Sequence, residues 1–436
     1  MMKSVRVESN DKGDRIGIIL FVCILLSFIP ILITSLFLPG LKSSSLYAAS
    51  IGLAFFIQTV ILFFYYGISK ESQINKGLIV LGGLFLTAQI ITVSISMMGL
   101  LRVDTFDYIN VLVRFVGFIF FVSIPYYFKM TKTGLLKFMK CIVLMGFIAC
   151  VYNMVYNYAG LRNILSINNP YAVNFKSFFL GRNSFAQFLF FATVANTFLF
   201  FSKRSLFHWL CYFLFLFNIF ATLSRTVMAS ISLFIFFFFI LYYRKKVISR
   251  IVILASAGMI VLSIVSNTTL TTFIKDILIR SDTGTTGRSV IWEIAIQMLN
   301  HNNWAFGIGY MTSSSLLKDM GYTSQFHSFF IETLVGGGLI DLLLHLSIIF
   351  LVIRKVIHIY KYDQTTGIIF ISAYIALVFY SLFESVSYFS IGYVDSMFRT
   401  FFITLPLLYS NAFPSAKSME KSRLISEELM INKRAV

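Results

Sequence analysis

The sequence is poor in charge: of its 436 residues only 12% are Asp, Glu, Lys or Arg, whereas a soluble domain carries about 25%. Hydrophobic residues make up 58% of the chain, and 50 residues are Phe. Apolar runs of about 20 residues recur, the length that a helix needs to cross a bilayer. The shortage of charge therefore excludes a soluble domain and predicts an all-α polytopic membrane protein.

Cysteine is also scarce, with four residues in the whole chain: Cys23, Cys141, Cys150 and Cys211. All four fall inside apolar runs, which favours small buried side chains over disulfides or a metal site. The first 15 residues are too polar for a cleaved signal peptide, so we expect the first span to be retained.

The hydrophobic pattern predicts about twelve transmembrane helices, with two long connections. The spans are 16–38, 46–67, 77–98, 108–128, 135–157, 183–201, 205–222, 226–243, 249–266, 328–353, 367–388 and 396–410. The resulting organisation is a cytoplasmic N-tail (1–15), nine helices over 16–266 with an external loop at 158–182, a large external loop at 267–327, three helices over 328–410 and a cytoplasmic C-tail (411–436).

Lysine and arginine set the orientation of these spans. With the N-terminus in the cytoplasm, the inside segments hold 24 Lys and Arg residues and the outside segments hold 11. This is the positive-inside bias, so both termini are predicted to be cytoplasmic and both long loops external. The net charge of +18 is thus a topology signal and requires no nucleic-acid partner.

The two sides differ in which basic residue they use. The inside segments hold 16 Lys and 8 Arg, and the outside segments hold 4 Lys and 7 Arg. Topology does not distinguish the two residues, but a phosphate site does, because guanidinium binds phosphate through two parallel hydrogen bonds. The alternatives are scatter in small numbers or an outer surface that binds a phosphorylated ligand.

Three outer segments each contain one of these seven arginines. "LGRNSFAQF" places Arg182 and Asn183 at the start of a span, and "TLSRTVMAS" places Arg225 between two adjacent spans. In "TGRSVIWEIAIQMLN", Arg288 precedes an amphipathic helical pattern. Each arginine is a candidate anion ligand beside a helix start. The alternatives are a helix cap with an interfacial anchor for Arg182, snorkelling to the interface for Arg225 and an ordinary surface helix for Arg288.

The segment "HSFFIETLVGGGLID" leads into the tenth span. His327, at an aqueous boundary, is a candidate general base, and Glu332 lies about 7.5 Å further along if helical. The three glycines at 336–338 are then expected to interrupt the helix. In a membrane protein such an interruption indicates close packing or a cavity. The alternative for His327 is a helix-end anchor. Arg114 and Glu384, both inside spans, form a candidate ion pair.

In order and topology, these motifs resemble the O-antigen ligase/polymerase superfamily, most closely the Wzy-type polysaccharide repeat-unit polymerases. The similar features, over roughly residues 180–400, are "GRN", "SR", "GR…W", "GIG" and "H…ET…GGGL". Ser328 stands where the family usually has asparagine after the histidine.

The resemblance implies a GT-C-like membrane glycosyltransferase that needs no metal or other cofactor. It would act in the bacterial cytoplasmic (inner) membrane, joining undecaprenyl-pyrophosphate-linked repeat units into O-antigen, capsular or exopolysaccharide at the outer face. Arg288, Arg225, Arg182 and Asn183 would bind the pyrophosphate substrate, and His327 or Glu332 would be catalytic. A chain-length regulator and a flippase are the implied partners.

Two other functions stay open. A ligase of the same superfamily would transfer the same lipid-linked glycan to a different acceptor. A transporter or flippase of lipid-linked sugars would show repeated halves with broken helices, and no such repeat is evident in the sequence.

Overall fold

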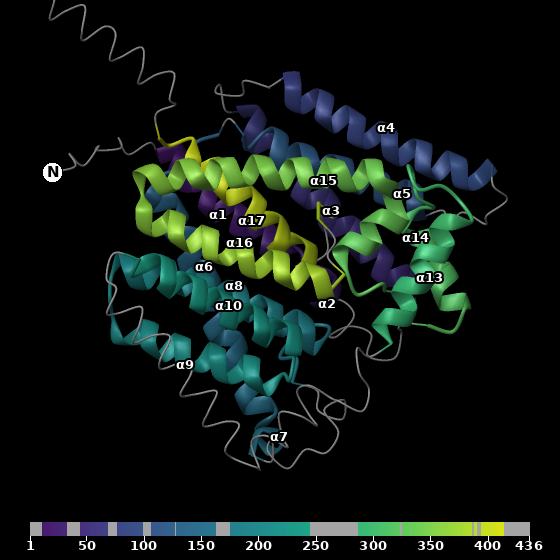
Figure 1. Cartoon of the computed structure of the whole chain (residues 1–436). Helices are drawn as coiled ribbons and strands as arrows, with labels where there is room; N and C mark the ends of the chain where they lie inside the picture. The colour runs from purple at the N-terminus through teal and green to yellow at the C-terminus, as the bar shows by residue number, and fades with distance from the viewer. Residues whose placement is uncertain are drawn as a thin grey trace, which may run out of the picture.

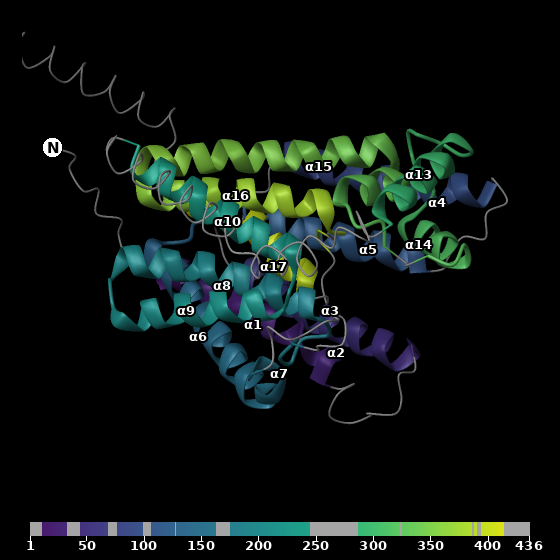
Figure 2. The ribbon, with the colours of Figure 1, turned by 60° about the horizontal axis from the view of Figure 1, so that its bottom comes forward.

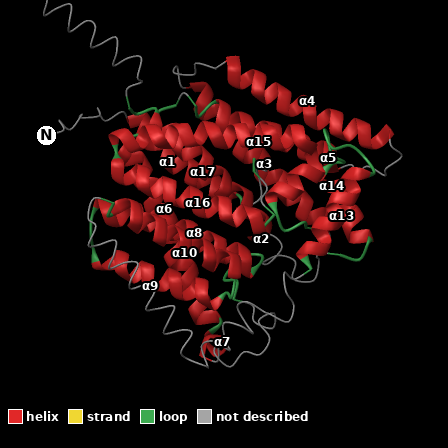
Figure 3. Cartoon of the chain, viewed as in Figure 1, coloured by secondary structure: helices red, strands yellow, loops and turns green. Residues whose placement is uncertain are grey.

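The computed structural model describes residues 11–32, 44–68, 76–98, 106–126, 128–162, 175–244, 287–322, 325–385, 388–389 and 394–413. All regular secondary structure in these ranges is helical, as Figure 3 shows. The helices are α1 (Asp11–Leu26), α2 (Ile29–Leu32), α3 (Ser44–Ile68), α4 (Lys76–Met98), α5 (Phe106–Phe118), the π-helix η2 (Ile119–Ser123), α6 (Lys132–Tyr156), α7 (Tyr158–Arg162), α8 (Arg182–Ser202), α9 (Leu206–Ala221), α10 (Arg225–Tyr242), α13 (Arg288–Asn300), α14 (Tyr310–Asp319), α15 (Phe329–Tyr362), α16 (Gln364–Phe383) and α17 (Val394–Ser410). The expected all-α fold is confirmed for this part of the chain.

Seven helical segments in the described ranges are long and apolar enough to cross a membrane: Gly13–Ile31, Ala49–Tyr66, α6, α8, α10, α15 and α16. Two shorter apolar segments are Val80–Ser94 and Leu206–Ala221. The chain is therefore a polytopic helical membrane protein. The span expected at 249–266 lies outside the described residues, and the number of twelve stays a prediction.

The span expected at 328–353 coincides with the first part of helix α15, which continues to Tyr362. The part of this helix after a break at Gly338, residues 339–362, is about 36 Å long at 1.5 Å per residue, more than the roughly 30 Å of hydrocarbon. Charged residues such as Arg354 and Lys355 do not end a helix that continues beyond the bilayer.

Phenylalanine rings fill the centre of the bundle, where α8 packs against α6, α16 and α17. The ring of Phe191 in α8 lies 5.7 Å from Phe398 and 4.4 Å from Phe402, both in α17 (centroid distances). By contrast, α9 leaves Leu206 and Phe213 largely exposed, as expected of side chains that face lipid. The four cysteines carry no disulfide.

Polar contacts gather at the two ends of α15. Asp363, which follows its last residue, accepts hydrogen bonds from Lys132 and Tyr409, each at 2.9 Å. The other end, next to His327, lies beside α13 and α14 in both Figure 1 and Figure 2. Loops that the sequence assigns to opposite sides of the membrane thus lie at opposite ends of this helix, although which end faces the cytoplasm stays a prediction.

Helix α15 is broken at Gly338, where φ is 73° and ψ is −173°. The segment 304–309 packs into the break, and Ile308 donates its backbone N–H to the carbonyl of Val335 at 2.8 Å. A Cβ on Gly338 would lie 2.2 Å from the carbonyl oxygen of Ala305. The predicted interruption is confirmed, and close backbone packing is its cause.

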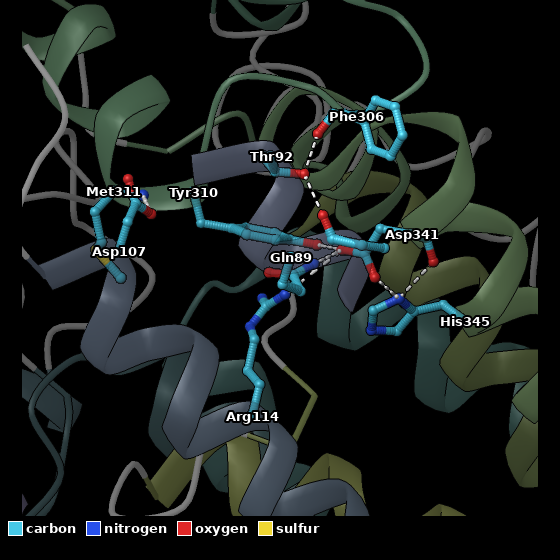
Figure 4. A network of polar contacts seen from close by, with 10 residues as sticks. Gln89, Thr92, Asp107, Arg114, Phe306, Tyr310, Met311, Asp341 and His345 are labelled. Atoms are coloured by element: carbon cyan, nitrogen blue, oxygen red, sulfur yellow. Dashed lines mark hydrogen bonds and ion pairs between the residues drawn. The ribbon is translucent and has the colours of Figure 1, made fainter. Parts of the chain in front are cut away.

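Asp341, one turn after the break, is the centre of a buried polar network (Figure 4). Its Oδ2 accepts hydrogen bonds from Tyr310 at 2.5 Å and Gln89 at 2.6 Å, and lies 3.9 Å from Arg114 Nη1. The Arg114 guanidinium stacks 3.5 Å above the Tyr310 ring. The expected pairing of Arg114 with Glu384 is therefore wrong: the carboxylate partner of Arg114 is Asp341, whose network fastens α14 to the bundle.

Candidate active site

Glu384 lies directly after α16 and joins the starts of two other helices. Arg288 is the first residue of α13, and Gly287 before it has a φ of 75°, which glycine adopts without strain. Arg288 Nη2 lies 3.3 Å from Glu384 Oε1. Thr226, the second residue of α10, donates its hydroxyl to the same Oε1 at 3.1 Å. The starts of α10 and α13 therefore meet at one carboxylate.

Arg225 is the first residue of α10 and follows a three-residue connection, 222–224. Leu223 in this connection has a φ of 52°, a left-handed conformation that is uncommon for residues other than glycine. The chain reverses there within a very short distance. Arg225 is half-buried, and the bond from neighbouring Thr226 ties its helix start to Glu384.

His327 precedes α15 and is half-buried. Its backbone also has a left-handed conformation, with a φ of 53°, and its N–H donates to Ser385 Oγ at 3.0 Å. Burial lowers the pKa of His327, the Glu384 carboxylate raises it and the Arg288 guanidinium lowers it, with a net lowering. The imidazole is therefore mostly neutral near pH 7, the form in which it can accept a proton.

Glu332 lies one turn into α15, with its carboxyl group close to the Ser385 side chain. Two guanidinium groups, of Arg114 and Arg399, lie within electrostatic range of its carboxylate. Its Oε2 is buried and has no hydrogen-bond partner within the described ranges. Glu332 and His327, the two candidate bases, thus share Ser385 as a neighbour.

Arg182 and Asn183 begin α8, after Gly181. Arg182 is half-buried and Asn183 is exposed. This helix start contacts α17, where Ser184 donates its hydroxyl to Asp395 Oδ2 at 2.8 Å. The structure thus brings Arg288, His327, Glu332 and the start of α10 around residues 384–385, whereas Arg182 and Asn183 lie on the neighbouring α8–α17 contact.

Arg399 lies in α17 and is a further buried charge close to this site. It is 4% exposed and donates from Nη1 to the carbonyl of Ser385 at 2.8 Å and from Nη2 to Gln187 Oε1 at 3.2 Å. It thereby connects α17, α8 and the residue after Glu384. In the sequence, Arg399 is recognisable as a charge inside an apolar helix, and such a charge requires partners. The sequence does not identify those partners.

Residues 210–346 match the family model Wzy_C, described as O-antigen ligase. The matched stretch, about a third of the chain, includes Arg225, Arg288, His327 and Glu332. The match confirms the resemblance to the O-antigen ligase/polymerase superfamily and supports a role in processing lipid-linked glycans for O-antigen or related polysaccharide. A search of curated proteins found no match.

Proposed function

We propose that this protein is a polymerase that joins undecaprenyl-pyrophosphate-linked oligosaccharide repeat units into O-antigen, capsular or exopolysaccharide at the outer face of the bacterial cytoplasmic membrane. The observation that carries the proposal is the convergence of Arg288, Thr226 and His327 on the dipeptide Glu384–Ser385. Phosphate-binding side chains and a candidate base thus lie together at one end of an apolar bundle, where a lipid-linked sugar phosphate would meet them.

The reaction is a glycosyl transfer from a growing polyprenyl-pyrophosphate glycan to a lipid-linked repeat unit. The acceptor hydroxyl oxygen forms a bond to the anomeric carbon of the donor, and the bond from that carbon to the pyrophosphate oxygen breaks. The hydroxyl proton passes to His327 or Glu332, and polyprenyl pyrophosphate leaves. A positioned general base typically contributes about 10²- to 10⁴-fold to such a rate.

The arginines stabilise the charge on the leaving pyrophosphate. Arg182, Arg225 and Arg288 are each the first residue of a helix, where the helix dipole adds to the attraction for anions. Arg288 Nε is buried and has no hydrogen-bond partner among the described residues, so it can donate to a phosphate. We assign Arg288 and Arg225 to the pyrophosphate, with Arg182 and Asn183 in support.

These arginines would do the work of a divalent cation, so we propose a metal-independent reaction. The test uses purified protein in lipid nanodiscs with a synthetic polyprenyl-pyrophosphate repeat unit. We expect a ladder of longer lipid-linked glycans that persists with excess EDTA. A requirement for added Mg²⁺ or Mn²⁺ would contradict metal independence, and no elongation under any condition would contradict the polymerase.

A ligase is the second candidate, because the matching family model is described as O-antigen ligase. Deletion in the host separates the two functions. Loss of a polymerase leaves single lipid-linked units, whereas loss of a ligase leaves lipid-linked polymer that reaches no acceptor. A flippase would instead move the substrate across the bilayer with no change in glycan length. A chain-length regulator and a flippase are the expected partners of the polymerase.

A further inference from the structure

Ser385 is in direct contact with His327, the candidate base before α15. Its Oγ accepts the backbone N–H of His327 at 3.0 Å. A serine hydroxyl has lone pairs that accept such a bond. Glu332, the other candidate base, lies close to the same side chain.

We propose that Ser385 is a positioning residue for the glycosyl transfer, which holds His327 in the geometry that proton removal requires. The inference rests on the proposed function, since it takes His327 as the base. Ser385 itself takes no proton from substrate and acts only through His327.

The backbone of His327 shows why such a residue is needed. Its φ of 53° is strained for a residue with a side chain, and such conformations persist only where neighbouring contacts hold them. The bond from its N–H to Ser385 is such a contact. Because the direction of the imidazole depends on φ, loss of this bond would let the ring move away from the acceptor hydroxyl.

Ser385 is itself fixed by the bundle. Its carbonyl accepts a hydrogen bond from Arg399 Nη1 at 2.8 Å, and Nη2 of the same guanidinium donates to Gln187 in α8. Glu384, the preceding residue, binds Arg288 and Thr226. Two consecutive residues thus fix the proposed phosphate-binding arginine through one side chain and the backbone of His327 through the other.

The test compares Ser385→Ala and Ser385→Thr in purified full-length protein in nanodiscs, with the synthetic lipid-linked repeat unit as substrate. We expect Ser385→Ala to lower kcat about tenfold to hundredfold, the effect of a displaced catalytic group, with KM nearly unchanged. Ser385→Thr keeps the hydroxyl, so it should retain most of the wild-type kcat. The matched control is Ser372→Ala, in the preceding helix α16: Ser372 is 0% exposed and its hydroxyl has no partner within the described residues.

A double-mutant comparison separates positioning from a general structural effect. In a His327→Ala background, Ser385→Ala should lower kcat less than about threefold, because the imidazole it positions is absent. Equal losses in both backgrounds, or a wild-type kcat in Ser385→Ala, would overturn the inference. Thermal unfolding checks the fold, and should Ser385→Ala unfold, Ser385→Cys replaces it in the same comparisons.

The outcome for the proposed function is read separately. If the wild-type protein makes no ladder and instead transfers the glycan to another acceptor, the polymerase proposal is wrong. The Ser385 variants are then compared in that transfer reaction. If the ladder forms equally with serine and alanine at position 385, the polymerase stands and the positioning role fails.

Discussion

Arg288 and Glu384 are 96 positions apart in the sequence, and their side chains meet with Nη2 and Oε1 at 3.3 Å. The pair joins the first residue of α13 to the end of α16. Its side chains are 18% and 11% exposed, so the guanidinium is held in place and is still accessible to a ligand. An arginine fixed in this way loses little freedom when it binds a phosphate, which favours a site that is ordered before substrate arrives.

Arg288→Ala should abolish long-chain glycan while the protein remains in the membrane. The substitution removes a proposed pyrophosphate ligand and leaves the Glu384 carboxylate without its arginine partner, and removing one such preorganised donor typically costs about 10²- to 10³-fold in kcat. Gel analysis of glycan length, with immunoblots of membrane fractions, measures both effects. Arg204→Ala is the control, because Arg204 is exposed and contacts Phe200 by a cation–π interaction. Wild-type glycan in Arg288→Ala would exclude this role.

Arg225→Lys should also impair the transfer, although it keeps the charge. Lysine lacks the planar fork that binds two phosphate oxygens at once. We expect a rise in KM for the lipid-linked substrate together with a lower kcat, since the pyrophosphate is contacted before and during bond cleavage. Initial rates over a range of substrate concentrations measure both constants. Full activity of Arg225→Lys would contradict two-point binding at this residue.

His327→Ala should reduce kcat by about 10²- to 10⁴-fold, the usual contribution of a general base. The matched control is His301→Ala, since His301 is an exposed residue at the end of α13. Single-turnover transfer from labelled donor reports the chemical step directly. Glycan of wild-type length in a His327→Ala strain would leave Glu332 as the candidate base.

The pH dependence follows from the lowered pKa of His327. Imidazole acts as a general base only when it is neutral, so kcat/KM falls as the pH drops through the pKa of His327. Burial and Arg288 lower this pKa from its ordinary value of about 6.5, so activity should persist to a lower pH. Glu384 raises the pKa of His327, so Glu384→Gln should move the acid limb of the pH–rate profile further down. A limb that stays in place or moves up would contradict the electrostatic contact.

Gly338→Ala should destabilise the protein. The φ of 73° and ψ of −173° at Gly338 are essentially restricted to glycine and cost about 1–3 kcal/mol for a residue with a Cβ, and the added Cβ would lie 2.2 Å from the Ala305 carbonyl oxygen. Gly52→Ala is the control, because a Cβ there meets nothing within 4 Å. Thermal unfolding in detergent should show a lower midpoint for Gly338→Ala only. Equal midpoints would mean that the break at Gly338 does not hold segment 304–309.

Part of the candidate site was predictable from local sequence. Arg182, Arg225 and Arg288 each stand where an apolar helical pattern begins, and the structure starts α8, α10 and α13 at these residues. The pattern worked because a helix start depends on residues within one or two turns. Helix α15 continues past position 353, where the predicted span ends, because charged residues indicate where a bilayer can end and do not end a helix.

The partners of the buried charges were not predictable. Arg114 pairs with Asp341, and Glu384 with Arg288; in both cases the ion pair joins different helices. The amino-acid sequence determined that the chain is helical, crosses a membrane and begins several helices with arginine, because hydrophobicity and helix period are local properties. Only the tertiary structure decided which carboxylate each guanidinium reaches, because that depends on how helices distant in sequence pack side by side.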